Sequence, residues 1–289
     1  MKRILTSIAV AGLLATNSFA MDAKTAKVSK NAVIKAEKNA QQNTQLVKEA
    51  INAIRNTQDA LIYLNGKDKK NAINSLKKAI GDLAVVLNTP NPPYLLPVDI
   101  NFEAYQFSGN IKTVASLVQK AKALVIANKL PQAREVLNTL RDEIVIKTIN
   151  LPLVTYPAAL KLSIKYINEN KIKEAKEVLA MALSTLVEVK TIIPIPLVKA
   201  QNLIIEASKI VKKDPKEALK YLDEAKRQLK IGKVLGYTST SETTYKMLKD
   251  KINHLEKEIK AKHNTSNLFE RLIEKIKDFE HKSITRSSK

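Results

Sequence analysis

One spacing recurs along this chain and restricts it to a mainly helical fold. It places alanine, leucine and a further small or apolar residue at positions i, i+4 and i+7, which form one stripe of an α-helix. Each copy follows a segment that breaks helices, such as Asn65-Gly66 or Asn128. The four copies are Ala72, Leu76 and Ala79; Ala133, Leu137 and Leu140; Ala175, Leu179 and Ala182; and Ala218, Leu222 and Ala225.

The distances between copies indicate a repeated structural unit. The first alanines are separated by 61, 42 and 43 residues. The long step implies an insertion of about 18 residues, which the proline-rich segment at residues 90–99 can supply. Short turns make consecutive helices antiparallel, and alanine lets the paired helix approach closely. We therefore predict an all-α fold of repeated antiparallel helical hairpins, packed either as a bundle or as a short solenoid.

Proline-rich segments connect the predicted hairpins. Four prolines within residues 90–97 exclude a helix there and favour extended backbone. The same segment holds apolar Leu95, Leu96 and Val98, which are atypical of a disordered linker. We therefore expect an ordered connection packed on the helices. Proline also brackets the apolar segments at residues 151–157 and 193–198.

The N-terminus has the organisation of a cleavable export signal. Lys2 and Arg3 precede an apolar stretch at residues 4–16, and Ser18-Phe19-Ala20 fits a small-x-small cleavage site. The stretch is shorter than the ~20 residues that span a bilayer. We predict a signal peptide at residues 1–20, cleavage after Ala20 and a periplasmic location. A helical domain is then expected at residues 31–236 and a basic C-terminal helical extension at residues 237–289.

The C-terminal extension contains two amphipathic segments. The first has the 3,4 spacing of a coiled coil, over only about two heptads, and can dock on its own domain or on another chain. The second can pack on a partner or lie on a membrane surface, and it is the one segment for which we consider membrane contact. The first comprises Tyr245, Leu248, Ile252, Leu255 and Ile259, and the second comprises Leu268, Phe269, Leu272, Ile273, Ile276 and Phe279.

Charge and residue types argue against a nucleic-acid-binding protein and against an enzyme. The net charge is +21, but 42 of the 49 basic residues are lysines spread along the chain rather than clustered with arginine and aromatic residues. Cysteine is absent, and the three histidines have no metal-ligand spacing. The adjacent carboxylates Asp142 and Glu143 are expected at the surface. We predict no catalytic residues, no metal site and no cofactor.

The proline-rich segments also hold the candidate binding residues. They place polar and aromatic side chains beside stiff apolar backbone, as small-molecule sites often do. The alternative is that these segments only link helices, with the tyrosines covering the core. The candidates are Tyr94, Asp99, Glu103, Tyr105, Thr155, Tyr156 and Lys161.

Several segments together resemble the YfdX family of exported bacterial proteins. They are the leader, residues 96–99 (LPVD), residues 151–159 (LPLVTYPAA), and residues 174–186 followed by Ile195-Pro196-Leu197. The resemblance extends over residues 33–236. It implies an all-helical periplasmic protein that forms homo-oligomers and has stress-related or chaperone-like roles, with no catalytic residues to carry over.

Three functions therefore remain open. The first is a non-enzymatic periplasmic protein that binds client proteins or itself. The second is a small-ligand binding protein that uses the proline-rich segments. The third is a binder of the membrane surface or of an envelope polymer through the basic C-terminus.

Overall fold

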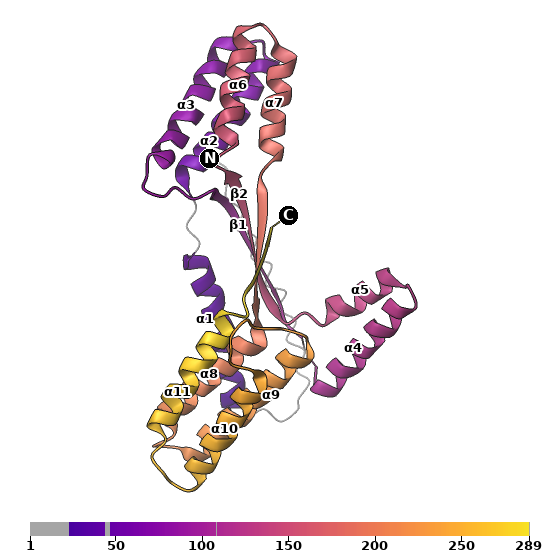
Figure 1. The fold of residues 1–289 in the computed structure, drawn as a ribbon, viewed down its shortest axis with the longest axis vertical. Coiled ribbons are helices and arrows are strands. Elements are labelled where there is room, and N and C mark those ends of the chain that lie inside the picture. The colour runs from indigo at the N-terminus through magenta and orange to yellow at the C-terminus, as the bar shows by residue number, and fades with distance from the viewer. Residues whose placement is uncertain (1–22, 44–46, 108, 289) are drawn as a thin grey trace. The chain divides into compact units, whose positions relative to one another are not determined.

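The computed structural model describes residues 23–43, 47–107 and 109–288 (Figure 1). The predicted signal peptide and its cleavage site lie outside these residues. The chain forms two compact units, each assembled from separate stretches of sequence. One unit contains residues 102–145 and 191–286 with the N-terminal helix, and the other contains residues 42–101 and 146–190.

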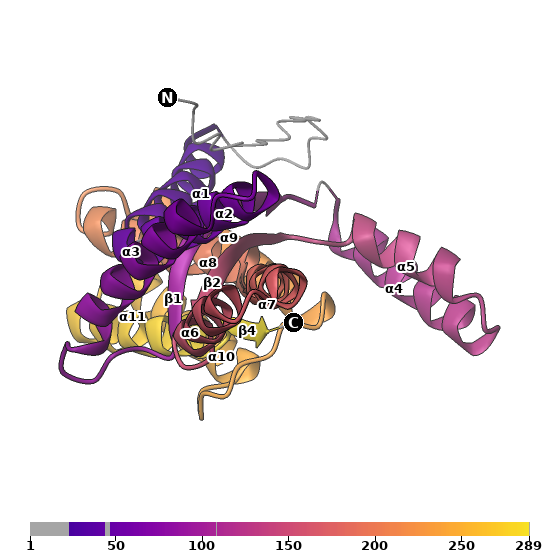
Figure 2. The same cartoon turned by 90° about the horizontal axis from the view of Figure 1, so that it is seen from above.

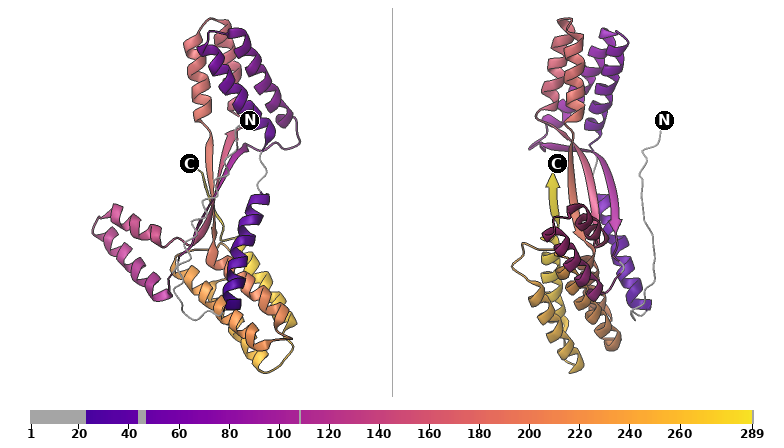
Figure 3. Two further views of the ribbon diagram at one scale, coloured as in Figure 1. Left: turned by 180° about the vertical axis from the view of Figure 1, so that it is seen from behind. Right: turned by 90° about the vertical axis from the view of Figure 1, so that its right-hand side faces the viewer.

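The second of these units contains a four-helix bundle, here called the α2–α7 bundle. Its hairpins are α2 (Lys48–Asn65) with α3 (Lys69–Leu87), and α6 (Tyr156–Asn168) with α7 (Ile172–Ser184). Helix α3 contacts α6 and α2 contacts α7, so the two hairpins pack face to face. Figure 3 shows these four helices side by side in both of its views. The alanine and leucine stripes of α3 and α7 are buried in this core.

The other unit contains a second bundle, the α8–α11 bundle. Its helices are α8 (Ile195–Ile210), α9 (Pro215–Val234), α10 (Tyr245–Lys260) and α11 (Ser266–His281). Each contacts the next, and α11 contacts α8, which closes the ring. The apolar faces of α10 and α11 form much of the core. The two amphipathic segments of the C-terminal extension therefore dock on their own domain, which was one of the open alternatives, because their apolar faces meet those of α8 and α9.

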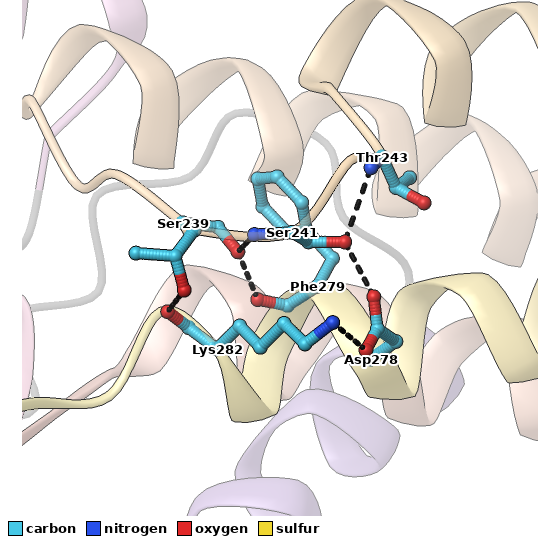
Figure 4. A network of polar contacts seen from close by, with 7 residues as sticks. Ser239, Ser241, Thr243, Asp278, Phe279 and Lys282 are labelled. Carbon is cyan, nitrogen blue, oxygen red and sulfur yellow. Dashed lines mark hydrogen bonds and ion pairs between the residues drawn. The ribbon is translucent and has the colours of Figure 1, made fainter.

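The segment between α9 and α10 is held on α11 by a hydrogen-bond network (Figure 4). The Ser239 hydroxyl donates to the Phe279 carbonyl at 2.8 Å, and the Ser241 hydroxyl donates to the Asp278 carboxylate. The Lys282 ammonium lies 2.9 Å from the other oxygen of Asp278. These contacts hold the pKa of Asp278 below its ordinary value, with the Ser241 hydrogen bond as the largest cause.

Two further helical elements belong to the same unit as the α8–α11 bundle. Helix α1 (Ala23–Asn43) contributes Val28 to the edge of the bundle core, and the Val28 carbonyl accepts a hydrogen bond from the Asn202 amide. Helices α4 (Ile111–Ile126) and α5 (Leu130–Thr139) form another hairpin, whose α4 also contacts α9. Figure 2 shows α4 and α5 lying against each other.

Each proline-rich connection includes part of a β-strand, which the sequence pattern did not predict. The described residues form one four-stranded sheet in the order β1-β2-β3-β4. Each strand follows a helical hairpin, so the repeated unit is a hairpin plus a strand. The prediction of a mainly helical fold built from hairpins with ordered connections is confirmed. The strands are β1 (Leu95–Tyr105), β2 (Glu143–Pro152), β3 (Val187–Pro194) and β4 (Thr285–Ser288).

Four of the hairpins turn in the same way. One residue in each turn has a left-handed backbone, with φ between 55° and 62°. The amide that follows it donates to the carbonyl five residues earlier, at 2.8–3.0 Å. This arrangement satisfies carbonyls at the helix end. The turn residues are Lys67 in α2–α3, Asn128 in α4–α5, Asn170 in α6–α7 and Lys262 in α10–α11.

Three boundaries differ from what the local sequence pattern indicates. The pattern predicts a single helix over residues 31–64, but Val47 is extended and its N–H donates to the Pro97 carbonyl at 2.8 Å. It predicts a helix from Pro131 to Ile146, but α5 ends at Thr139 and β-branched residues continue as β2. It indicates disorder from Ser283 onward, but residues Thr285–Ser288 form β4.

Candidate functional site

Two of the proline-rich segments meet, as a shared binding layer would require. The Leu153 N–H donates to the Tyr94 carbonyl at 2.9 Å, so the segment before β1 lies beside the segment before α6. The Tyr94 side chain is 80% exposed, Val154 is 69% exposed, and Thr155 is also exposed. This surface is part of the unit that holds the α2–α7 bundle.

The other predicted site residues are distributed differently. Tyr156 is buried in the core of the α2–α7 bundle, and burial raises the pKa of its hydroxyl. Asp99 and Lys161 are exposed. Glu103 and Tyr105 are joined on β1, where the tyrosine hydroxyl donates to the carboxylate at 2.7 Å. Tyr156 is therefore a core residue rather than a binding residue, as the alternative interpretation of the proline-rich segments predicted.

Tyr105 also belongs to a buried polar cluster at the start of β2. The Arg141 guanidinium lies 3.4 Å from the centre of the Tyr105 ring, and its Nε lies 2.7 Å from Glu143 Oε1. The Tyr237 hydroxyl donates to Glu143 Oε2 at 3.1 Å and accepts from the Asp142 N–H at 3.2 Å. This cluster joins β1, β2 and the segment after α9 within one unit.

The carboxylates expected at the surface are in fact buried in this cluster. Asp142 is 3% exposed and Glu143 is 9% exposed. Burial raises the pKa of Asp142 to about 6, while the positive charge of Lys199 and a hydrogen bond from the Phe107 backbone act in the opposite direction. The surface expectation was wrong because β-strand pairing, rather than local polarity, determines where residues after α5 lie. Burial thus favours the protonated form of Asp142 relative to an exposed aspartate.

No group of metal-ligating side chains large enough to hold an ion occurs in the described part of the chain. Two histidines flank one carboxylate at the surface: His263 Nδ1 lies 2.7 Å from Glu258, and His254 Nδ1 lies 3.9 Å from it. The contact with His263 lowers the pKa of Glu258. With one carboxylate and two exposed imidazoles, this set is a helix-end contact rather than a metal centre.

The α4–α5 hairpin carries an apolar surface that the sequence pattern did not reveal. Ile126 is 87% exposed at the end of α4, and Leu130 is 53% exposed at the start of α5. Val125 and Leu137 are each 49% exposed. We call these four residues the hairpin surface. Several exposed apolar side chains on one element are a feature of protein interaction sites.

The repeated stripe of the sequence contains one residue of the hairpin surface, but it does not show that this residue is exposed. Leu137 occupies the leucine position of the repeated stripe, which is a core position in the other copies. The pattern alone shows that a helix has an apolar face, but not whether another helix covers it. The tertiary structure was needed to separate this copy from the rest.

No helix among the described residues has the length and hydropathy needed to cross a membrane. The apolar side chains of α11, the segment for which membrane contact was an alternative, are buried or half-buried in the α8–α11 bundle.

The chain is similar to known proteins over part of its length. A family model described as "YfdX protein" matches residues 53–192. A solved structure of YfdX from Salmonella Typhi is 14% identical to the chain, with a TM-score of 0.35, covering 51% of this chain and 92% of that one. A comparison with curated proteins gave no match. The family match spans α4–α5, α6–α7, most of α2–α3 and most of β3, a shorter region than the predicted resemblance. The YfdX family model thus matches residues 53–192, in agreement with the resemblance that the sequence motifs indicate.

Proposed function

We propose that this protein is a non-enzymatic helical protein of the periplasm that acts by binding other polypeptides, with a chaperone-like role. The observation that carries the proposal is the hairpin surface, where Val125, Ile126, Leu130 and Leu137 expose apolar side chains on one hairpin. Burying such side chains contributes roughly 25 cal/mol per Å² of apolar area removed from water.

The predicted export leader, the match to the YfdX family model and the composition support the location and the type of protein. A chain without cysteine depends on packing rather than disulfides for stability, so it tolerates either redox state. The polar clusters found in the structure join secondary-structure elements to one another. Arg141, Glu143 and Tyr237 are hydrogen-bonded to one another in such a cluster, which favours a structural over a catalytic role for these side chains.

Suppression of aggregation tests the proposal directly. Insulin aggregates when its disulfides are reduced, and the reductant leaves this protein intact because it has no cysteine. We expect the full chain to suppress that aggregation. The double variant Val125→Ser/Leu137→Ser should lose most of the effect, because both substitutions place a polar hydroxyl on the hairpin surface.

A matched control separates the hairpin surface from general surface hydrophobicity. Ile62 on α2 and Met181 on α7 are 66% and 67% exposed, so Ile62→Ser/Met181→Ser removes comparable exposed apolar side chains. Suppression should persist in this control. Equal loss in both double variants would show that the hairpin surface is not the binding site.

Small-ligand binding is a second candidate, and one observation favours it. Tyr94 and Val154 are exposed at the place where two proline-rich segments meet. Native mass spectrometry of the purified protein tests this candidate. A bound small molecule that is lost in Tyr94→Ala would support it, and a bare protein mass after purification from the periplasm would count against it.

A further inference from the structure

A basic side chain lies between the two apolar residues of the hairpin surface on α5. Leu130, Arg134 and Leu137 occupy positions i, i+4 and i+7 of that helix, so they form one stripe. All three side chains are exposed. Along the helix axis, Arg134 lies about 6 Å from Leu130 and about 4.5 Å from Leu137. A partner that covers both leucines therefore also covers the guanidinium group.

Helix α4 and the turn show the same combination of charge and apolar surface. Lys122 and Ile126 are four residues apart on α4, so their side chains are neighbours on one face. Lys129 lies in the turn between Ile126 and Leu130, and its side chain is exposed. We call Lys122, Lys129 and Arg134 the flanking cations. Each of them lies next to an apolar residue of the hairpin surface.

The flanking cations are not balanced by negative charge in their own hairpin. Residues 111–139 contain five basic side chains and one carboxylate, that of Glu135. Glu135 is five residues from Leu130, which corresponds to about 140° of rotation around the helix, so it lies on the other side of α5. Within the part of the chain that the structure describes, none of the flanking cations forms an ion pair. In the α6–α7 hairpin, by contrast, the Lys171 ammonium lies 2.7 Å from the Glu169 carboxylate.

The start of α5 adds further positive charge to the same place. A helix N-terminus carries a partial positive charge and backbone N–H groups without helical partners. Helix α5 begins at Leu130 with no side-chain cap and no acidic residue in its first turn. The Asp68 carboxylate caps α3, and α7 has Glu174 in its first turn. The end of the α4–α5 hairpin thus lacks the acidic residue that α3 and α7 have.

We infer that the hairpin surface binds acidic amphipathic segments of other polypeptides, whose apolar side chains cover its apolar residues and whose carboxylates pair with the flanking cations. The inference rests on the proposed function and names the chemical class of the partner. A helical segment with apolar residues seven positions apart and a carboxylate between them matches the α5 stripe, because two helices share the same rise per residue. Arginine binds carboxylates through paired hydrogen bonds that are stronger than those between neutral groups.

The position of Lys129 favours a polypeptide over a lipid bilayer. Inserting Ile126 and Leu130 into a bilayer would carry the Lys129 ammonium toward the hydrocarbon, because Lys129 lies between them in the turn. A charged side chain in that environment is costly. A polypeptide with carboxylates among its apolar residues pairs with the ammonium instead. The alternation of charge and apolar surface therefore fits an acidic polypeptide.

Fluorescence anisotropy with three labelled peptides tests the inference on the full chain. Each peptide is a helix of about 18 residues, or five turns, with the same leucines on one face. The positions between the leucines are glutamate, glutamine or lysine. We expect the glutamate peptide to bind about tenfold more tightly than the glutamine peptide, and the lysine peptide to bind most weakly. Added sodium chloride should reduce these differences by screening the charges.

Charge reversal locates the preference on the hairpin. Lys122→Glu/Arg134→Glu should bind the glutamate peptide about tenfold more weakly and should bind the lysine peptide more tightly than the native chain does. Because the variant gains one ligand as it loses the other, the result is distinct from misfolding. Lys77→Glu/Lys78→Glu changes two exposed lysines of α3 and alters the net charge equally, so it is the control. It should keep the native preference.

Other outcomes overturn the inference. Equal binding of the three peptides does so, as does an equal effect of the two charge-reversal variants, which would assign the preference to the net charge of the whole chain. Binding to phosphatidylglycerol vesicles that is lost in Val125→Ser/Leu137→Ser, without a preference among the peptides, would assign the surface to a membrane.

The insulin assay keeps the proposed function separate from this inference. If the native chain shows no preference among the peptides but still suppresses insulin aggregation through the hairpin surface, the inference fails and the proposed function stands. If Val125→Ser/Leu137→Ser suppresses aggregation as well as the native chain does, the proposed function fails, and the inference fails with it.

Discussion

Hairpins α4–α5 and α6–α7 are consecutive in the chain, yet they are used differently. They share the same left-handed turn, the same alanine after it and the same stripe leucine. Leu179 is fully buried in the α2–α7 bundle, and Leu137 is half exposed. The difference shows that the hairpin is an independent module in this fold. Whether its outer face becomes core depends on a second hairpin being present.

The largest effect should come from truncating the stripe leucine in the two hairpins. Leu179→Ala should lower the free energy of unfolding by about 3 kcal/mol, because it opens a cavity in a closed core. Leu137→Ala should cost less than about 1 kcal/mol, because its side chain is half solvated before the change. Urea unfolding of the two variants and the native chain measures both. Similar losses would mean that the hairpin surface is covered.

The next largest effect is the pH dependence of stability, and it differs between the carboxylates that follow the two hairpins. Asp142, after α5, is buried. Glu188, after α7, is partly exposed and lies 3.2 Å from the Lys190 ammonium. Asp142 has a pKa of about 6 when folded and an ordinary value of 3.8. The folded state therefore keeps the Asp142 proton to a higher pH than the unfolded state does. The stabilisation that comes from this difference is fully present below pH 4 and is lost as the pH rises to 6. The loss amounts to about 3 kcal/mol at most.

Asp142→Asn tests that assignment. The variant keeps an acceptor oxygen for the Phe107 N–H but carries no charge at any pH, so it should be more stable than the native chain at pH 7. The advantage should disappear near pH 4. Comparing variant with native chain at each pH cancels the general effect of acid on a basic protein. Glu188→Gln, whose carboxylate is only partly buried, is the control and should show little of this slope.

A smaller effect is expected from overfilling the small-residue position. Ala175→Leu and Ala218→Leu should each destabilise by about 1–3 kcal/mol, because the partner helices leave no room for a larger side chain. Ala133→Leu should cost less than either, because α5 can move outward where no second hairpin opposes it. Thermal unfolding of the three variants ranks them. If Ala133→Leu proved the most harmful, the hairpin would be more constrained than its exposure indicates.

The smallest effect should be equal in the two hairpins. Asn128→Ala and Asn170→Ala both replace a residue that tolerates left-handed backbone with one that does not, at a cost of about 1 kcal/mol each. Their turns are the same, so the two losses should match within error by urea unfolding. A clear difference would show that the turns are supported differently by their surroundings.

Helix positions were the part of the fold that local pattern predicts best. The stripe that follows Gly66 predicts a helix over residues 69–87, which coincides with α3, and Pro131 and Pro157 lie in the first turns of α5 and α6, where proline is favoured. The strands were missed because residues 143–152 contain little strict alternation, and their pairing involves distant segments. Of the seven candidate site residues, the local pattern placed Tyr156 and Tyr105 in one group. The structure puts one in a bundle core and the other in a charged cluster.

What the sequence determined by itself is the hairpin. The breaker, the left-handed turn residue, the alanine and the leucine stripe are local features, and helix formation and short-range packing depend on residues close in the chain. What only the tertiary structure decided is which hairpins pair, which segments become strands and which carboxylates are buried. Those outcomes depend on contacts between residues far apart in sequence, and Leu137 and Leu179 satisfy the same local pattern with different surroundings.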